Sequence, residues 1–144
     1  SLLAPSAGTV TLTVNGVSGT HSAKIADSAA ATFNAGYLET PVNTQTGAYT
    51  AVLADSGKTI YYTGSTAVAL TIPANASVAY PVGTVLTFVN DASAAVSVTI
   101  PITTDTLQWV SGGTTGTRTL GRYGMATAVK VTSTKWIISG SGLS

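Results

Sequence analysis

Two seven-residue strings that end in proline constrain the fold of this chain most strongly. The string at Ala67–Pro73 (AVALTIP) is echoed at Ala95–Pro101 (AVSVTIP). Each string alternates a larger side chain with a smaller or polar one, which is the pattern of a half-buried β-strand. The closing proline has no N–H to donate, so strand pairing stops there. The echo, with a weaker third member at 128–132, indicates either an internal duplication or the convergence of half-buried strands on similar strings.

Many further stretches have the composition of short strands. They are Thr9–Val14, Tyr37–Val42, Ala48–Leu53, Thr59–Tyr62, Val85–Val89, Val96–Ile100, Thr106–Val110, Thr117–Leu120, Ala126–Val131 and Lys135–Ser139. The last two are expected to form a hairpin around Thr132-Ser133-Thr134. Short strands at roughly regular spacing are typical of sandwiches and barrels. The sequence therefore predicts an all-β fold, an antiparallel β-sandwich or a barrel-like domain, with an extended N-terminal arm.

The polar stretch Asn43–Gly47 is expected to be a loop that separates two parts of the chain. We predict an N-terminal arm or connector over residues 1–47 and the β-domain over residues 48–144. Within the arm, His21–Asn34 has alanines and Phe33 at spacings of three and four, which suits one short helix or an extended connector equally. Ser1 fits a start left by removal of an initiator Met, or a cut within a longer chain.

Charge is scarce in this chain. Charged residues make up 8% of the sequence and the net charge is +1, against about 25% charged residues in typical soluble domains. A near-neutral chain lacks the basic footprint of a nucleic-acid-binding protein. No apolar run reaches the ~20 residues that a membrane-spanning helix needs, so no membrane insertion is expected. The mean hydropathy of +0.38 instead predicts a surface covered by partners, most simply further copies of the same chain.

Residues for catalysis are few and scattered. His21 is the single histidine, no G-x-S-x-G motif is present, and cysteine is absent. Asp91 and Asp105 could face each other as a glycosidase pair does, but aspartates near turns usually serve the turn. Zinc would lack its usual Cys and His ligands. We therefore expect no enzyme, no catalytic residue, no cofactor and no metal site.

Aromatic side chains are the strongest candidates for contact with a ligand or a partner. Tyr61 and Tyr62 are adjacent, so in a strand they point to opposite faces, and Trp109 lies next to a glycine-rich loop. Exposed aromatic rings bind sugars, but Tyr and Trp also anchor protein interfaces. Trp136 is expected in the core. The cations Arg118, Arg122, Lys130 and Lys135 suit either an anionic ligand or a solvated face.

Three strings resemble bacteriophage virion proteins. They are Tyr49–Lys58 (YTAVLADSGK), Leu70–Thr84 (LTIPANASVAYPVGT) and Lys135–Gly140 (KWIISG). Similar strings occur at the ends of phage tail and fibre proteins and in small phage proteins, and the resemblance covers about two thirds of the chain, from residue 49 onward. It implies a β-rich module on the virion surface, usually trimeric. The shared strings mark strands and turns, so the resemblance assigns no catalytic or binding residue to this chain.

Within that resemblance, the short chain suits a capsid decoration, or cement, protein. Such a protein binds the shell of major capsid protein as a trimer and stabilises it. The candidate contacts with the capsid or a sister subunit are the apolar residues of the N-terminal arm, Leu2, Leu3, Val10, Leu12 and Val14. A strand there could add to an exposed sheet edge. The alternative is a tail-fibre module that recognises a host cell-surface glycan through Tyr61, Tyr62 or Trp109.

Overall fold

The computed structural model describes residues 40–144 of the chain. The chain divides into two units, Ser1–Tyr37 and Leu38–Ser144, and the description below concerns the second. The expected strand Thr9–Val14 and the helix or connector His21–Asn34 lie outside the described residues. So do the expected contacts Leu2, Leu3, Val10, Leu12 and Val14.

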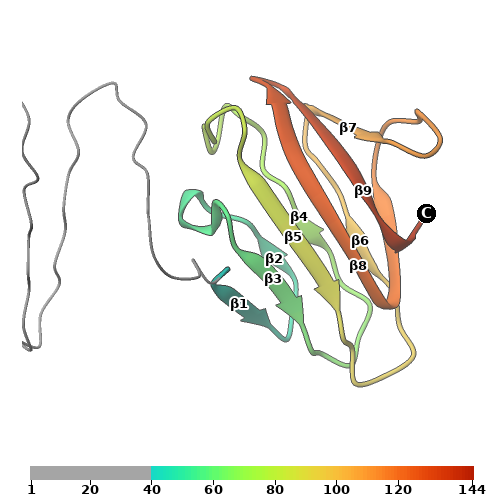
Figure 1. The fold of residues 1–144 in the computed structure, drawn as a ribbon. Coiled ribbons are helices and arrows are strands. Elements are labelled where there is room, and N and C mark those ends of the chain that lie inside the picture. Colours follow the sequence, from blue (N-terminus) through green and yellow to red (C-terminus); the bar gives the residue numbers. More distant parts are fainter. Residues whose placement is uncertain (1–39) are drawn as a thin grey trace, which may run out of the picture. The chain divides into compact units, whose positions relative to one another are not determined.

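The first strands of the domain wind as a coil whose strands alternate between two sheets (Figure 1). One sheet takes β1 (Val42–Gln45), β3 (Thr59–Tyr62) and β5 (Val85–Asn90), and the other takes β2 (Tyr49–Thr50) and β4 (Leu70–Thr71). Neighbours within a sheet are therefore one coil apart in the sequence, and they run parallel. The expectation of a purely antiparallel arrangement is wrong for this half, because no two successive strands pair with each other.

The sequence echo marks equivalent positions in successive coils. Thr59 of β3 pairs with Thr87 of β5, and the echoed strings begin at Ala67 and Ala95, so the same offset of 28 residues separates both pairs. Bridges between Ala69 and Thr99 and between Ile72 and Ile102 join the echoed strings side by side, two residues out of the register of the echo. A shift of two residues keeps the same side chains on the inner face.

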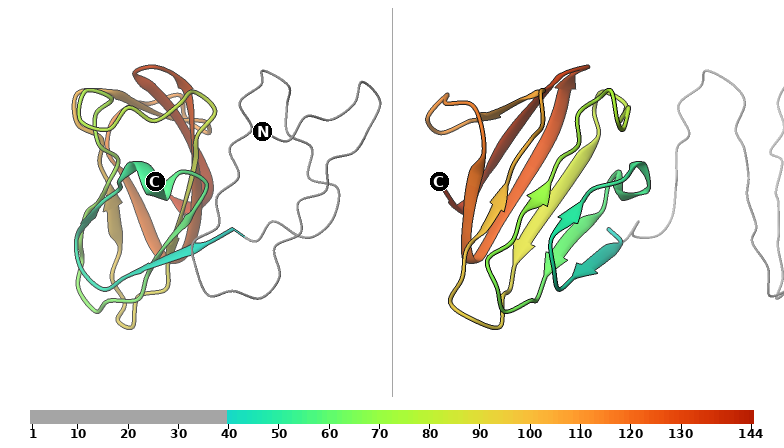
Figure 2. Two further views of the ribbon diagram at one scale, coloured as in Figure 1. Left: turned by 90° about the vertical axis from the view of Figure 1, so that its left-hand side faces the viewer. Right: turned by 180° about the vertical axis from the view of Figure 1, so that it is seen from behind.

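The C-terminal strands complete the larger sheet. They are β6 (Val98–Ile100), β7 (Thr106–Trp109), β8 (Arg118–Thr132) and β9 (Lys135–Leu143), and the strand order is β1-β3-β5-β8-β9-β7, with β6 on β8. The expected hairpin is confirmed, because β8 and β9 pair antiparallel on either side of Ser133 and Thr134. β8 bends sharply, so its first residues pair with β6 and its last with β5 (Figures 1 and 2).

The all-β fold is confirmed: strands dominate residues 40–144, and their helical content is the single 3-10 turn η1 (Leu53–Asp55). Inward side chains of both sheets form one core, in which Ile60, Phe88 and Trp136 come from the larger sheet, Leu70 from the smaller one, and Ile72 directly follows β4. Trp136 therefore lies in the core as expected. Burial of each large apolar side chain stabilises the fold by about 1.5–3 kcal/mol.

The start of the domain differs from the expected boundary. Residues 43–45 were predicted to be a loop, but they belong to β1, which pairs with β3. The polar side chains tolerate the inward positions because they bind one another: Gln45 Nε2 donates to Asn43 Oδ1 at 2.7 Å, and Asn43 Nδ2 donates to Asp55 Oδ1 at 2.9 Å. β1 is thus part of the domain that was expected to begin at residue 48.

Candidate binding corner

The two adjacent tyrosines point to opposite faces of β3, as expected. Tyr61 lies on the outer face of the larger sheet, whereas Tyr62 is 0% exposed and donates its hydroxyl to the Thr66 carbonyl oxygen at 2.6 Å. The prediction that Tyr62 is available to a ligand or partner is therefore wrong. Successive side chains of a strand point to opposite faces, and Tyr62 occupies a position of β3 that faces the core.

Trp109 is half-buried, and neighbouring groups already contact its ring. The guanidinium of Arg118 lies 5.8 Å from the ring centroid. A Cβ atom added at Gly112 would come within 3.2 Å of Trp109 Cε3, so the loop backbone packs on the same side chain. Arg118 is in turn held by the Gly116 and Thr115 carbonyl oxygens, at 3.1 and 3.0 Å. The Trp109 side chain therefore packs against the loop that follows β7 and is not free to bind a ligand.

Tyr123 is the exposed aromatic ring of the domain. Its side chain is 72% exposed, and it lies at the bend of β8, where the pairing with β9 changes register between Leu120 and Met125. Its φ is +64°, in the left-handed region that costs an ordinary residue about 1–2 kcal/mol. The next residue must be glycine, because a Cβ at Gly124 would lie 2.8 Å from the Gly121 backbone carbonyl oxygen. Bulges of this kind re-aim side chains.

Arg122 supports the Tyr123 ring. Its guanidinium carbon lies 4.5 Å from the ring centroid, within cation–π range. Arg122 Nε donates to the Ala92 carbonyl oxygen at 2.7 Å, and Nη2 to the Ser93 carbonyl oxygen at 3.4 Å. The guanidinium is thereby fixed between the loop after β5 and the ring, and it covers one face of Tyr123.

Asp91 and Tyr61 supply polar groups beside this ring. The Tyr61 hydroxyl donates to Asp91 Oδ2. That hydrogen bond raises the pKa of Tyr61 above its ordinary value, because the neutral phenol is the donor. Asp91 itself is exposed and directly follows β5.

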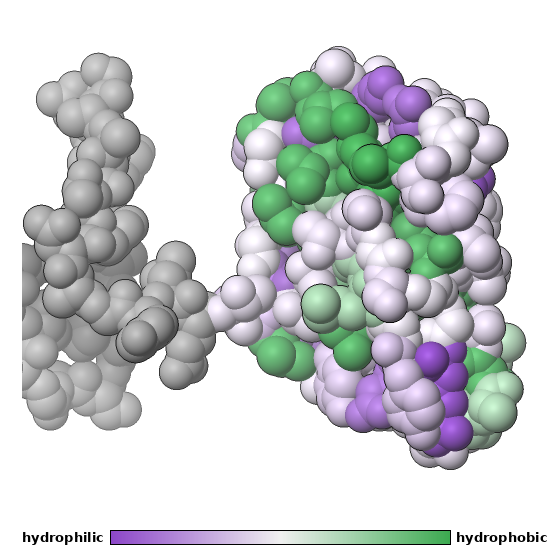
Figure 3. Space-filling model, turned by 45° about the vertical axis from the view of Figure 1, so that its right-hand side comes forward, coloured by the Kyte–Doolittle hydropathy of each residue, from purple (hydrophilic) through white to green (hydrophobic). Residues whose placement is uncertain are grey.

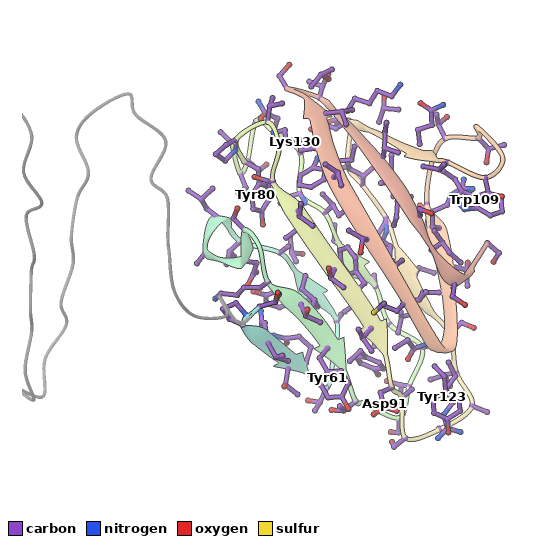
Figure 4. All side chains as sticks on the ribbon, viewed as in Figure 1. Tyr61, Tyr80, Asp91, Trp109, Tyr123 and Lys130 are labelled. Atoms are coloured by element: carbon purple, nitrogen blue, oxygen red, sulfur yellow. The ribbon has the colours of Figure 1, made fainter. Side chains whose placement is uncertain are left out.

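Strand register brings these residues together at one end of the domain. Tyr61 pairs with Val89, and Val89 pairs with Met125, across β3, β5 and β8. Asp91 and Tyr123 lie two residues beyond Val89 and Met125 in the sequence, past the end of the β5–β8 pairing. Figure 4 shows Tyr61, Asp91 and Tyr123 along the same lower end. We name Tyr61, Asp91, Arg122 and Tyr123 the aromatic corner.

The opposite end of the domain is built around a buried lysine. Lys130 is 1% exposed, and its Nζ donates to Asn75 Oδ1 at 2.6 Å and to the Tyr80 carbonyl oxygen at 2.8 Å. The Tyr80 and Trp136 rings meet edge to face, with centroids 5.6 Å apart. Burial raises the pKa of Tyr80, whose hydroxyl donates to the Val52 carbonyl oxygen. Lys130 is therefore neither on a solvated face nor open to an anionic ligand.

The two aspartates considered as a catalytic pair lie at opposite ends. Asp105 Oδ2 accepts from the Asn75 backbone N–H at 2.8 Å, and Asn75 is the residue that binds Lys130. Asp91 lies at the aromatic corner, far from Lys130 in Figure 4. A third carboxylate, Asp55, is buried and accepts from the Tyr49 hydroxyl and the Val52 N–H, at 2.7 and 2.9 Å. Asp55 and Asp105 thus hold backbone and side-chain groups of the protein in place, whereas Asp91 is exposed and accepts from Tyr61.

The aromatic corner offers non-covalent binding: an exposed ring, a carboxylate acceptor and a supporting cation. Within residues 40–144, no group of three or more His, Cys, Asp or Glu side chains lies close enough to hold a metal ion. No helix in that part of the chain is long and apolar enough to cross a membrane. Neither the family models, the curated proteins nor the solved structures compared with this chain gave a match.

Tyr123 was not among the aromatic residues that the sequence singled out, although it lies between two glycines. The available signal was the Gly121-Arg122-Tyr123-Gly124 string within an otherwise strand-like stretch, because a glycine inside a strand often marks a bulge. The partnership of Tyr61 with Asp91 had no local signal, since the two residues meet only through the pairing of β3 with β5.

Proposed function

We propose that this protein is a non-enzymatic structural protein of a bacteriophage virion, a decoration protein that binds the shell of major capsid protein as a homotrimer. Its place is the exterior of the capsid. The phage-like strings of the sequence support the virion assignment. The observation that carries the assembly is the outer face of the larger sheet.

The outer face of the larger sheet is almost free of charge. Its central positions are Thr87, Val89, Met125, Thr127, Val129 and Ile137. Along the outward positions of β5, of β8 from Met125 onward and of β9, the charged residue is Lys135, next to the β8–β9 turn. Figure 3 shows hydrophobic surface gathered on the upper half of the side that it presents. Depletion of charge at the centre, with Met and aromatic residues present, is the composition of a protein interface.

The solution mass of the chain tests this assembly. Light scattering after gel filtration is expected to give about three times the chain mass of 14.4 kDa. Thr127→Lys, at the centre of the outer face, is expected to reduce the mass to that of one chain, because a buried unpaired ammonium opposes association. Thr50→Lys is the matched control, since Thr50 is exposed on β2 in the other sheet. A monomeric wild type, or equal masses for both variants, would contradict the trimer.

Attachment to capsids tests the decoration role separately. The full chain is mixed with purified empty shells of the phage that encodes it and is then pelleted. The wild type is expected to sediment with the shells at saturable stoichiometry, and to raise the temperature at which the shells disassemble. A trimer that stays in the supernatant would overturn decoration while leaving the oligomer intact.

We also propose that the two sheets form a β-sandwich. The shared core between Ile60, Phe88 and Trp136 on one side and Leu70 and Ile72 on the other supports this architecture. A crystal structure with two stacked sheets about 10 Å apart is the expected result, and one continuous closed sheet is the contradicting one.

The alternative that we propose is recognition of a host cell-surface glycan by a tail-fibre module. The specific observation in its favour is the exposed, supported ring of Tyr123. Retention of the chain on immobilised bacterial surface polysaccharide is the test, and the absence of binding to any polysaccharide would exclude this alternative.

A further inference from the structure

We propose that the aromatic corner is a saccharide-binding site, in which a neutral pyranose ring stacks on the open face of Tyr123 and donates hydroxyl hydrogen bonds to Asp91. The inference rests on the alternative function, glycan recognition, and names its residues and its ligand class. The sequence candidates Tyr62 and Trp109 are replaced by Tyr123, because one is buried and the other is covered by Arg118 and Gly112.

The left-handed backbone conformation of Tyr123 indicates that its ring does not serve the stability of the fold. A glycine would adopt its φ of +64° without the cost of about 1–2 kcal/mol that a residue with a Cβ incurs there. The ring does not recover this cost by burial, since it is 72% exposed. Strained non-glycine residues of this kind cluster at binding sites.

The ring is also oriented before any ligand arrives. Arg122 covers one face at 4.5 Å and is itself held by the carbonyl oxygens of Ala92 and Ser93. The partial positive charge on sugar C–H groups is attracted to the negative face of an aromatic ring. Because the ring is pre-oriented, little side-chain entropy is lost when a sugar stacks on it.

Asp91 gives the corner its polar selectivity. A carboxylate presents about four lone-pair positions, and Tyr61 occupies one of them on Oδ2. Sugar hydroxyls are the matching donors. The negative charge of Asp91 opposes acidic sugars, while Arg122 is occupied by backbone carbonyl oxygens. The corner therefore favours neutral hexopyranoses over uronic, sialylated or sulfated ones.

A second copy of the chain is the competing occupant, because Tyr and Arg are also common interface anchors. The exposed Asp91 beside the ring disfavours it, since aspartate is depleted in protein interfaces. Measuring both saccharide binding and oligomeric mass for the same variants distinguishes a sugar from a second copy of the chain.

The experiment measures binding of the full chain to an array of purified bacterial polysaccharides, both neutral and acidic. The wild type is expected to bind neutral members. Tyr123→Gly is expected to weaken that binding by about tenfold or more, because it removes the stacking contact and its buried area. Tyr123→Phe is expected to retain binding, and Asp91→Asn to weaken the preference for neutral over acidic members. Leu53→Ala is the control, because Leu53 is 55% exposed in η1, away from the corner.

The outcomes separate the site from the function. If the wild type binds no polysaccharide, the alternative function fails and the site fails with it. If the wild type binds and Tyr123→Gly binds equally well, glycan recognition stands and this site is wrong. If Tyr123→Gly lowers the oligomeric mass and leaves saccharide binding unchanged, the corner is a contact between copies of the chain and the proposal is overturned.

Discussion

The two ends of the domain use aromatic and charged side chains in opposite ways. At one end Lys130, Tyr80 and Trp136 lie inside, and the lysine ammonium donates to the Asn75 amide oxygen and the Tyr80 carbonyl oxygen. At the other end Tyr123 projects into solvent on a left-handed backbone, supported by Arg122. Both ends place a cation against an aromatic ring, but only the first buries the pair. We infer that the Lys130 end stabilises the fold and that the Tyr123 end is available to a ligand.

The largest expected effect comes from the ring at the buried end. Trp136→Ala should lower the free energy of unfolding by about 3–5 kcal/mol, the usual cost of removing a buried aromatic side chain. Urea unfolding followed by circular dichroism measures this change. The comparison of the two ends would be broken by a loss as small as that of an exposed residue, for which Val82→Ala in the β4–β5 connection is the control.

Removal of the buried ammonium should have the next largest effect. Lys130→Met keeps the aliphatic stem but leaves two acceptors, Asn75 Oδ1 and the Tyr80 carbonyl oxygen, without their donor. The expected loss is about 1–3 kcal/mol, the cost of leaving such groups unsatisfied. Lys135→Met, at a half-buried position on β9, is the matched control and should change stability by less. Equal unfolding curves for the two variants would show that Lys130 does not hold this end together.

The exposed end should respond with the opposite sign. Tyr123→Gly is expected to raise the free energy of unfolding by about 1 kcal/mol, because glycine relieves the left-handed strain and only part of that gain is lost to unfolded-state entropy. Thermal unfolding measures the shift. A variant that is clearly less stable than the wild type would show that Tyr123 supports the fold, and would remove the contrast between the ends.

The smallest effect concerns the protonation of Tyr61. Its hydrogen bond to Asp91 raises its pKa above the ordinary value of 10.0, so this bond adds stability below pH ~10 that is lost as the pH rises through the pKa of the folded state. Asp91→Asn should bring the Tyr61 pKa back toward 10.0. The ring-carbon NMR shift of Tyr61 between pH 8 and 12 follows the titration, with Tyr61→Phe for assignment. An unchanged pKa in Asp91→Asn would contradict the hydrogen bond.

Periodicity predicted individual strands well but not how they pair. Thr59–Tyr62 was predicted with its observed bounds, and its alternation predicted that Tyr61 and Tyr62 point to opposite faces, but not which of the two lies in the core. The parallel coil was missed because alternation reports which face a side chain occupies, not which strand lies beside it. The echo at Ala67 and Ala95 contained that information, as an offset of 28 residues that recurs in the register of β3 with β5.

The aromatic corner was less predictable than the strands. Residues 117–120 and 126–131 were expected as separate strands, but they are the two arms of one bent strand, β8. The residues between them therefore form a corner rather than a loop, and Tyr123 occupies it. Lys130 occupies an inward-facing position of β8, but its positive charge led to the prediction that it is exposed to solvent or to an anionic ligand. Long-range hydrogen bonds to Asn75 and Tyr80 override that tendency, and a pattern of single residues does not encode them.

The most direct test of the division between the two ends is an NMR titration of the full chain with a neutral oligosaccharide selected from the array. The account predicts chemical-shift changes at Tyr61, Asp91 and Tyr123, and none at Lys130 or Trp136. Shifts centred on the Lys130 end, or a titration in which no resonance of the aromatic corner moves, would contradict it.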